Sequence, residues 1–184
     1  MDRISAKPKL ATMWLGGCSG CHMSFLDMDE WLLELAGMAD IVCTPFQDVK
    51  KFPEGVDVTL VEGAVANEDH LGQIALVRAR SRVVVSFGDC AVTGNVTSLR
   101  NPLGKAEPVL RRSYIELATL NPRIPDEEGI VPRLLDRVLP VHEVVKVDYY
   151  IPGCPPPAAR IRHVLEELIA GREPTLEGRE LKFG

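Results

Sequence analysis

With 184 residues, of which 46% are hydrophobic and 26% charged, the chain is long enough for one well-packed core and gives no reason to expect two. Its formal net charge of -5 at pH 7, without a long run of lysine or arginine, excludes a general attraction to nucleic acid. No apolar stretch approaches the roughly 20 residues that a membrane span needs, and residues 1–10 carry neither a signal-peptide apolar region nor a twin-arginine pattern. We therefore expect a single domain over residues 1–184, a cytoplasmic location, and neither a nucleic-acid partner nor a membrane span.

Short β-branched runs alternate along the chain with patterns typical of helices. Strands are predicted at residues 10–15, 40–44, 56–62, 82–87 and 144–151. Helices are predicted at residues 24–39, 67–80 and 156–170. Alternation of this kind implies a parallel sheet with helices on both faces, so we predict an α/β fold, a flavodoxin-like doubly wound sheet.

Residues 95–142 interrupt this alternation before the last predicted strand. Six prolines lie too close together there for a long helix: Pro102, Pro108, Pro122, Pro125, Pro132 and Pro140. Short helices at residues 109–120 and 131–138 are the most that the pattern supports. We expect this proline-rich insertion to be irregular and to contact a partner.

Four of the five cysteines sit in short turns rich in glycine or proline. The turns read Gly-Gly-Cys18-Ser-Gly-Cys21, Phe-Gly-Asp-Cys90-Ala and Pro-Gly-Cys154-Pro-Pro-Pro. Glycine lets the backbone beside a ligand come close, and sets of four sulfur ligands are typical of iron–sulfur clusters or zinc. Structural zinc sites usually use two close Cys-x-x-Cys pairs, and only one such pair is present, which favours a cluster. The fifth cysteine, Cys43, is predicted to be a small buried apolar residue.

The predicted topology brings these cysteines to one edge of the sheet. Cys18 and Cys21 follow the first predicted strand, Cys90 the fourth and Cys154 the fifth. Carboxyl ends of parallel strands meet at a common edge, where open α/β sheets bind their ligands. Glu62 ends the third strand at the same edge. The sequence therefore predicts one metal centre built from three loops.

Four motifs, taken in order, resemble those of the small subunits of [NiFe] hydrogenases. They are Gly17-Cys18-Ser19-Gly20-Cys21, Glu62-Gly63-Ala64, Gly88-Asp89-Cys90-Ala91 and Pro152-Gly153-Cys154-Pro155-Pro156. The resemblance spans nearly the whole chain, and the residues that follow Cys21 look most like those of the cytoplasmic, bidirectional NAD-reducing enzymes. It implies that Cys18, Cys21, Cys90 and Cys154 bind a [4Fe-4S] cluster proximal to the nickel-iron centre of a partner large subunit.

The same resemblance implies a division of labour among subunits. The chain would relay electrons between H2 oxidation in the large subunit and a diaphorase module, whose subunits carry further iron–sulfur clusters, FMN and the NAD site. It would be an oxidoreductase subunit without a complete active site of its own. No cysteine follows Cys154, so one cluster is the most that the chain would carry. Glu62 would help to order the cluster pocket or pass protons, or would only bond nearby loop amides.

Other readings of the motifs stay open. One is the related iron–sulfur subunit of respiratory complex I, which couples to quinone and carries two adjacent cysteines at its first motif. Here two residues separate Cys18 from Cys21, which favours the hydrogenase. A zinc-bearing, non-redox interaction domain and a flavin-binding variant of the fold are the remaining alternatives.

Several residues close to the motifs carry expectations of their own. Asp89, directly before a candidate ligand, is expected to face solvent, because a second negative charge beside a thiolate cluster would lower its reduction potential. His22 directly follows a candidate ligand and is expected either to donate to the cluster or partner, or to bond within its loop. Trp14 and Trp31 are expected to fill the core.

Overall fold

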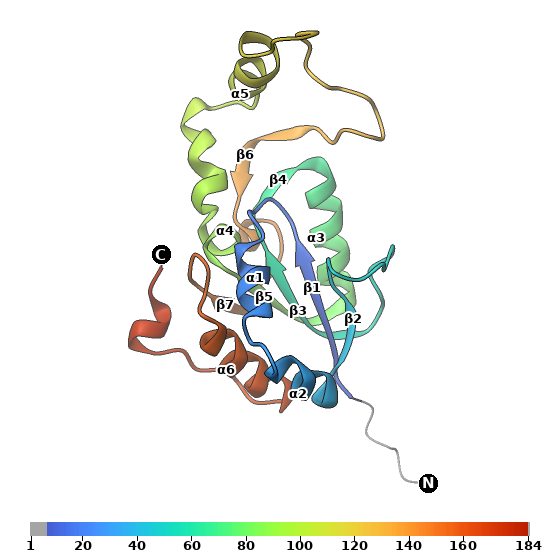
Figure 1. The fold of residues 1–184 in the computed structure, drawn as a ribbon, viewed down its shortest axis with the longest axis vertical. Coiled ribbons are helices and arrows are strands. Elements are labelled where there is room, and N and C mark those ends of the chain that lie inside the picture. Colours follow the sequence, from blue (N-terminus) through green and yellow to red (C-terminus); the bar gives the residue numbers. More distant parts are fainter. Residues whose placement is uncertain (1–6, 184) are drawn as a thin grey trace.

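A parallel sheet of five strands lies at the centre of the computed structural model, which describes residues 7–183 (Figure 1). The strands pair in the order β2 (Asp40–Cys43), β1 (Lys9–Trp14), β3 (Val56–Glu62), β5 (Ser81–Phe87) and β7 (Tyr149–Ile151). The α-helices are α1 (Gly20–Leu26), α2 (Trp31–Met38), α3 (Glu68–Arg80), α4 (Asp89–Thr93), α5 (Glu107–Arg111) and α6 (Ala158–Ile169). This strand order is the flavodoxin-like one, so the predicted fold class is confirmed.

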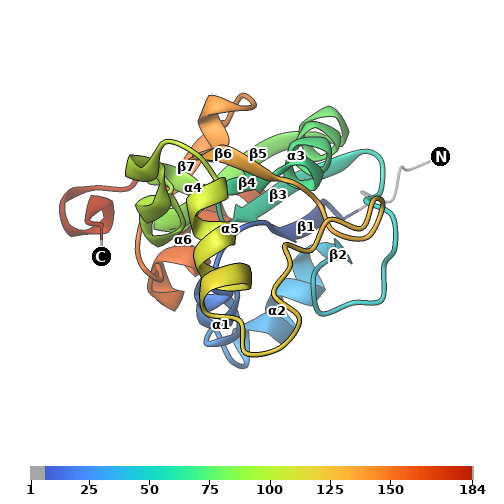
Figure 2. The same ribbon diagram turned by 90° about the horizontal axis from the view of Figure 1, so that it is seen from above.

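Two hydrophobic clusters cover the two faces of the sheet. On one face, α1, α2 and α6 pack against the strands through residues such as Phe25, Trp31 and Leu165. On the other, α3 contributes Ile74 and Val77 to a second cluster. Figure 2 shows the strands between these two groups of helices. Because both faces are covered, the carboxyl edge of the sheet is where loops meet and side chains of several elements converge.

The first two helices differ from the prediction. Residues 24–39 form no single helix, because the chain turns between α1 and α2, and Asp29 has a left-handed backbone with φ of 49°. Helix α1 also begins earlier than predicted, so Cys21 and His22 lie in its first turn. By contrast, α3 begins where predicted, after Asn67, whose side chain accepts a hydrogen bond from the His70 amide at 2.8 Å.

The last strand is shorter than predicted. Residues 144–151 yield only β7, and the three-residue 3-10 turn η3 (Val141–Glu143) precedes it. At Asp148 a side-chain oxygen accepts a hydrogen bond from the backbone of β5, in place of a backbone carbonyl. Its carboxylate accepts from the Val84 amide at 2.9 Å, and its own amide donates to the Val84 carbonyl at 2.9 Å. Pairing between β5 and β7 therefore starts only after Asp148.

The insertion contributes one strand to a small second sheet that the sequence did not predict. The helix expected at residues 131–138 is wrong, because β6 (Leu134–Leu139) forms a strand there and pairs antiparallel with β4 (Val65–Asn67). The side chain of Asn101 explains why this segment is extended, because it bonds to the backbone of β6. It donates to the Val138 carbonyl at 2.9 Å and accepts from the Val138 amide at 2.8 Å. These bonds to a residue far away in sequence keep β6 extended.

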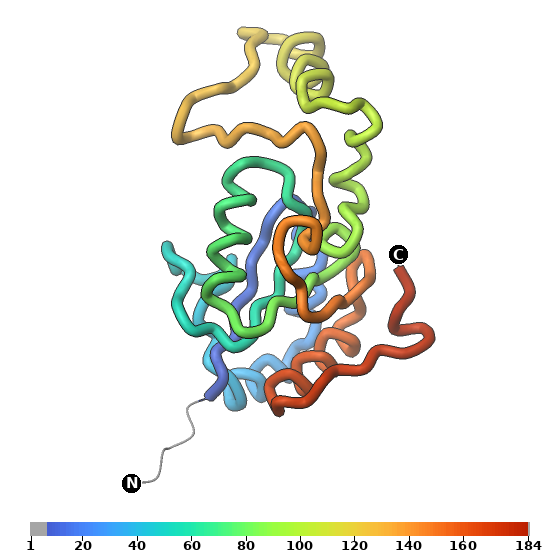
Figure 3. Tube along the Cα trace, turned by 180° about the vertical axis from the view of Figure 1, so that it is seen from behind, coloured from blue at the N-terminus to red at the C-terminus, as the bar shows by residue number. Residues whose placement is uncertain are grey.

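The rest of the insertion is mostly helical turns and an extended segment. A 3-10 helix η1 (Asn95–Leu103) leads into α5 and a π-helical turn η2 (Arg112–Glu116), so the short helix predicted at residues 109–120 is displaced towards the N-terminus. Residues 104–133, here called the arm, extend away from the sheet beyond its carboxyl edge (Figures 1 and 3). Arg100 fastens the base of the arm by donating to the Leu135 carbonyl at 2.6 Å.

The polypeptide closes with the 3-10 turn η4 (Gly178–Leu181). None of the helices within residues 7–183 combines the length and apolarity needed to cross a membrane. Residues 1–6, most of the segment on which the expectation about a leader sequence rests, lie outside the described residues.

Replacement of Asp148 by Asn tests the side-chain link between β5 and β7. Although partial burial acts to raise the pKa of Asp148, the Val84 amide and the Arg78 guanidinium at 2.6 Å lower it on balance. A lowered folded-state pKa stabilises the protein above the ordinary Asp pKa, and this stability disappears as pH falls through the folded value. We expect the variant to lose about 1 to 3 kcal/mol of unfolding free energy at pH 7.

Urea unfolding of both proteins from pH 7 to pH 3 measures this effect, and the difference should shrink towards the acid end. Asp48→Asn is the matched control, because Asp48 is an exposed carboxylate paired with the exposed Lys50, and its replacement should change little. An equal loss for Asp148→Asn at pH 7 and pH 3 would contradict the assignment.

Candidate metal centre

The cysteine loops, residues 15–21, 88–90 and 152–156, all follow strands at the carboxyl edge of the sheet. The first loop is fastened to the turn after β3. Gly16 and Ala64 exchange backbone hydrogen bonds at 2.9 and 2.8 Å, and the Leu15 amide donates to the Glu62 carbonyl at 2.8 Å. A side chain at Gly16 would come within 2.9 Å of the Ala64 carbonyl oxygen, so this close pairing needs glycine.

The first and second cysteine loops are in direct contact. Gly88 has φ of 83°, which glycine adopts without strain, and the Cys21 sulfur occupies the space where a Cβ of residue 88 would lie. The absence of a side chain at Gly88 is therefore what allows Cys21 to approach the loop that carries Cys90.

The second and third loops are joined through Asp89. The Gly153 amide donates to Asp89 Oδ1 at 2.6 Å, and the Asp89 amide donates to the Gly153 carbonyl at 2.9 Å. The expectation that Asp89 faces solvent is wrong, since only 5% of its surface is exposed. Its carboxylate faces the Cys154 loop because a backbone donor is available there, and a buried carboxylate requires such a donor.

The third loop is also attached to the helices on one face of the sheet. The Ser24 hydroxyl on α1 donates to the Pro156 carbonyl at 2.6 Å. Arg160 on α6 donates to the Pro152 carbonyl and, at 3.1 Å, to the Arg179 carbonyl in the C-terminal segment. Each of the three loops thus has hydrogen bonds to an element outside itself.

The thiols of the candidate ligands interact electrostatically with one another. Burial raises the pKa of Cys21 far above its ordinary value, and the negative charges of Glu62, Cys90, Cys18 and Cys154 raise it further. Burial likewise raises the pKa of Cys90, a hydrogen bond with Thr97 partly opposes this, and Cys154 and Cys18 add to it. Metal binding to such thiols displaces their protons, so it competes directly with these effects.

The four cysteines differ in their access to solvent. Cys21 and Cys90 are buried, whereas Cys18 and Cys154 are exposed. The site therefore opens on one side to the surface. Within residues 7–183, no set of three or more Cys, His, Asp or Glu side chains is arranged to bind one metal ion.

Glu62 lies where the sequence predicted, at the end of β3, and is buried. Its carboxylate bonds twice to His22, which directly follows Cys21. The His22 amide donates to Glu62 Oε2 at 2.9 Å, and His22 Nδ1 bonds the same oxygen. His22 Nε2 lies 2.9 Å from Thr12 Oγ1 on β1. The side chain of His22 therefore bonds to two strands, through Glu62 and Thr12, and not within its own loop as one of the two expectations had it.

Of the remaining expectations from the sequence, two are confirmed and one is wrong. Cys43 and Trp31 are buried as predicted, and the Arg162 guanidinium lies 5.2 Å from the centre of the Trp31 ring. Trp14 is not in the core, because 44% of its surface is exposed. It is the last residue of β1, at the edge that carries the cysteine loops.

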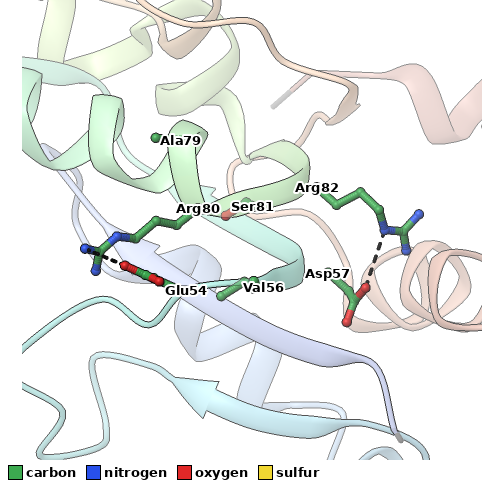
Figure 4. A pocket seen from close by; sticks show the side chains of 8 residues that line it. Glu54, Val56, Asp57, Ala79, Arg80, Ser81 and Arg82 are labelled. Atoms are coloured by element: carbon green, nitrogen blue, oxygen red, sulfur yellow. Dashed lines mark hydrogen bonds and ion pairs between the residues drawn. The ribbon is translucent and has the colours of Figure 1, made fainter. Parts of the chain in front are cut away.

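A separate open hollow of about 720 Å³ lies at the opposite, amino edge of the sheet (Figure 4). Its charged side chains pair with each other. Arg80 lies 3.4 Å from Glu54, and Arg82 lies 3.4 Å from Asp57. None of the eight residues that line it is cysteine or histidine, so it has no part in the candidate metal centre.

Comparison with known proteins shows the family to which the chain belongs. Residues 18–168 match the family described as NADH ubiquinone oxidoreductase, 20 Kd subunit, and the match begins at Cys18 and includes all four candidate cysteines. The chain belongs to this family. Relatives with similar sequences are hydrogenase subunits, as the resemblance of the motifs implied.

Two relatives illustrate the range of the family. The chain is 39% identical to the NAD-reducing hydrogenase HoxS subunit delta of Cupriavidus necator, over 90% of this chain and 80% of the relative. It is 41% identical to a subunit of the F420-non-reducing hydrogenase vhu of Methanocaldococcus jannaschii, over 94% of this chain. The chain spans only 60% of the length of that archaeal relative.

Solved structures agree with this family and with the fold. A chain in the crystal structure of an NAD+-reducing [NiFe]-hydrogenase in the H2-reduced state superposes with a TM-score of 0.91 at 38% identity, covering 97% of this chain and 99% of that one. A Ni-Fe-Se hydrogenase from Desulfomicrobium baculatum, at 14% identity and a TM-score of 0.57, shares the fold.

Sequence reasoning did not find some residues that organise this edge. Thr12 and Thr97 carried no signal, because a threonine within a strand or a proline-rich insertion has many ordinary roles. Asp89 carried a signal in its position before a candidate ligand, but its partner Gly153 lies 64 residues away. Such a pairing becomes visible only when the strand order is known.

Replacement of Gly88 by Ala tests the contact between the first two cysteine loops. The new Cβ would collide with the Cys21 sulfur and would also force a non-glycine residue into a backbone with positive φ. Backbone strain of this kind costs about 1 to 3 kcal/mol, before any displacement of Cys21 is counted. Thermal and urea unfolding should show this loss.

Gly72→Ala is the matched control for that variant. Gly72 lies within α3, with open space around the position of a new Cβ, and alanine favours helix. We expect it to stabilise the protein by about 0.4 to 1 kcal/mol. Equal stability of the Gly88→Ala and wild-type proteins would refute the close contact.

Proposed function

We propose that Cys18, Cys21, Cys90 and Cys154 bind a [4Fe-4S] cluster and that the chain transfers electrons as the small subunit of a [NiFe] hydrogenase. The observation that carries the proposal is the junction of three cysteine loops at one edge of the sheet, linked by Gly88 and Asp89. The pKa values of Cys21 and Cys90 support it, because beside burial the charges of the other candidate cysteines raise both, and such effects act over short distances.

The residues at this edge fit such a group. Four thiols are the ordinary ligand set of an iron–sulfur cluster. A cluster offers each thiolate its own iron, so the proposal does not require three donors to converge on one ion. When bound, the cluster supplies a centre that accepts and releases one electron at a time.

The protein's own contribution is to surround this centre and control its environment. Cys21 and Cys90 lie in the buried part of the site, where water is excluded. The loop backbones are fastened at Gly16 to Ala64 and joined to each other at Asp89 and Gly153, which keeps their amides in a fixed arrangement. Burial and hydrogen bonds around the sulfurs are the means by which a protein adjusts the potential of such a centre.

A large subunit that carries the nickel-iron site is the partner we propose for the open side of the centre. Exposed apolar side chains lie at the end of β1, on α1 and on η1: Trp14, Met23, Val96, Leu99 and Leu103. Exposed apolar side chains gathered on one part of a protein surface are typical of a site that a partner covers. We propose that the insertion at residues 95–142 belongs to the same contact.

The electron acceptor is proposed from the relatives. The chain covers 80% of the Cupriavidus necator NAD-reducing relative and 99% of the matching chain in the NAD+-reducing structure, whereas it covers 60% of the F420-non-reducing relative. We therefore propose a diaphorase module with further clusters, FMN and NAD as the acceptor. The family's description mentions ubiquinone, but the spacing of Cys18 and Cys21 favours the hydrogenase. The cytoplasmic location stays a prediction.

Cysteine variants test the ligand assignment. In protein co-purified with its partners and reduced by H2, Cys90→Ser should lower the iron and sulfide content and abolish or alter the low-temperature electron paramagnetic resonance signal of the cluster. It should also uncouple H2 oxidation from NAD+ reduction. Cys43→Ser is the matched control, because Cys43 and Cys90 are each only 7% exposed. Zinc without iron in the wild-type complex would refute the proposed function.

Charged substitutions test the docking side. Leu99 on η1 and Leu33 on α2 are 76% and 77% exposed and lie at opposite ends of the sheet. Leu99→Arg should reduce the amount of nickel-containing partner that co-purifies, because a charge is costly at the centre of an interface. Leu33→Arg should leave co-purification unchanged. If the two variants behave alike, the proposed docking side is wrong.

A further inference from the structure

A chain of three buried polar side chains lies directly beneath the first cysteine loop. It runs from Thr12 on β1 through His22 on α1 to Glu62 on β3. All three residues are almost completely buried. A buried carboxylate or imidazole is unfavourable unless its polar atoms are bonded, so each member depends on the others.

The geometry around Glu62 is one-sided. Both the backbone amide and Nδ1 of His22 bond to the same carboxylate oxygen, Oε2. Because a carboxylate only accepts hydrogen bonds, Nδ1 carries the proton in this contact. The other oxygen, Oε1, faces the turn before Cys18, and a Cβ on Gly17 would lie 3.3 Å from it. His22 therefore determines which oxygen points towards the cysteine loop.

The orientation of the His22 ring is itself fixed from three sides. Thr12 Oγ1 lies 2.9 Å from Nε2. The rings of Phe46 and Phe87 contact the imidazole edge to face, with centroids at 5.7 and 6.0 Å. Phe46 comes from the loop between β2 and β3 and is itself half exposed, so it separates the buried histidine from solvent. The ring has little freedom to release Glu62.

Glu62 is close enough to the cysteine loop for its charge to matter there. Its Oε2 accepts from the amide of His22, which directly follows Cys21, and its Oε1 faces Gly17, which directly precedes Cys18. A fixed negative charge beside a cluster that gains an electron disfavours the reduced form, and so lowers the reduction potential.

We propose that His22, oriented by Thr12, is a positioning residue that fixes the Glu62 carboxylate beside the Cys21 loop and thereby sets the reduction potential of the cluster. This inference rests on the proposed function, since it concerns the group assigned to the four cysteines. It adds a task for two residues that are not ligands. Neither Thr12 nor His22 needs to touch the cluster, because both act through Glu62.

The test is a double-mutant cycle read out by the reduction potential of the cluster, measured by redox titration of its paramagnetic signal in the complex with its partners. Glu62→Gln removes the charge and should shift the potential to a more positive value. His22→Leu removes the Nδ1 donor and leaves the backbone amide of residue 22 as the remaining bond to Oε2, so the carboxylate is held less firmly and the potential should shift in the same direction. In the double variant the shift should not exceed that of Glu62→Gln alone.

Conservative variants of His22 and Thr12 distinguish a role in positioning Glu62 from a role in stabilising the fold. His22→Asn keeps a side-chain N–H donor near the position of Nδ1 and should retain a potential closer to that of the wild type than His22→Leu does. Thr12→Val removes only the hydroxyl next to Nε2 and should give a smaller positive shift, whereas Thr12→Ser should give none. If His22→Leu fails to fold, the comparison of Thr12→Val with Thr12→Ser decides the question.

The possible failures can be told apart. A wild-type complex without an iron–sulfur signal would overturn the proposed function. A wild-type signal with an unshifted potential in His22→Leu, or with additive shifts in the double variant, would overturn the positioning role alone. Equal potentials in Thr12→Val and Thr12→Ser would also count against it.

Discussion

Hydrogen bonding between loops is the constraint on which the candidate metal centre depends. Each cysteine loop supplies only one or two sulfurs, so none of them forms a site alone. Backbone pairing of Gly16 with Ala64 fastens the first loop to the turn after β3, and the two bonds between Asp89 and Gly153 join the second loop to the third. Where the thiols need still more room, as Cys21 does against Gly88, the chain omits a side chain. The site is thus assembled mainly by the backbone.

The two edges of the sheet use polar groups in different ways. At the amino edge, Arg80 and Arg82 pair with carboxylates on an open surface, where such pairs contribute little to stability. At the carboxyl edge, Glu62, His22 and Asp89 are buried and bond to specific partners. Buried polar groups of this kind impose one arrangement on their surroundings, because any other leaves a donor or an acceptor without a partner.

Much of this architecture was predictable from the sequence, for identifiable reasons. Three strands of the main sheet, β2, β3 and β5, are β-branched runs, and the parallel order implied by the alternation of strands and helices puts the cysteine loops on one edge. Strand β6 was not predictable, because it owes its extended form to β4 and to the side chain of Asn101, 37 residues away from Val138. The burial of Asp89 escaped prediction for the same reason. Trp14 shows the reverse case, since a large apolar side chain at the end of a buried strand projects out of the core.

The Asp89–Gly153 pair has a consequence for the segment between its two members. The hydrogen bonds between Asp89 and Gly153 hold the two ends of residues 90–152 side by side, so this segment forms a closed loop. Each doubling of the length of a flexible loop adds only about 0.6 kcal/mol to the entropy of closure. The arm can therefore lengthen, shorten or change its course at small thermodynamic cost while the base stays closed. Changes in the arm, which we propose to contact the partner, therefore leave the geometry of the candidate sulfur ligands unaltered.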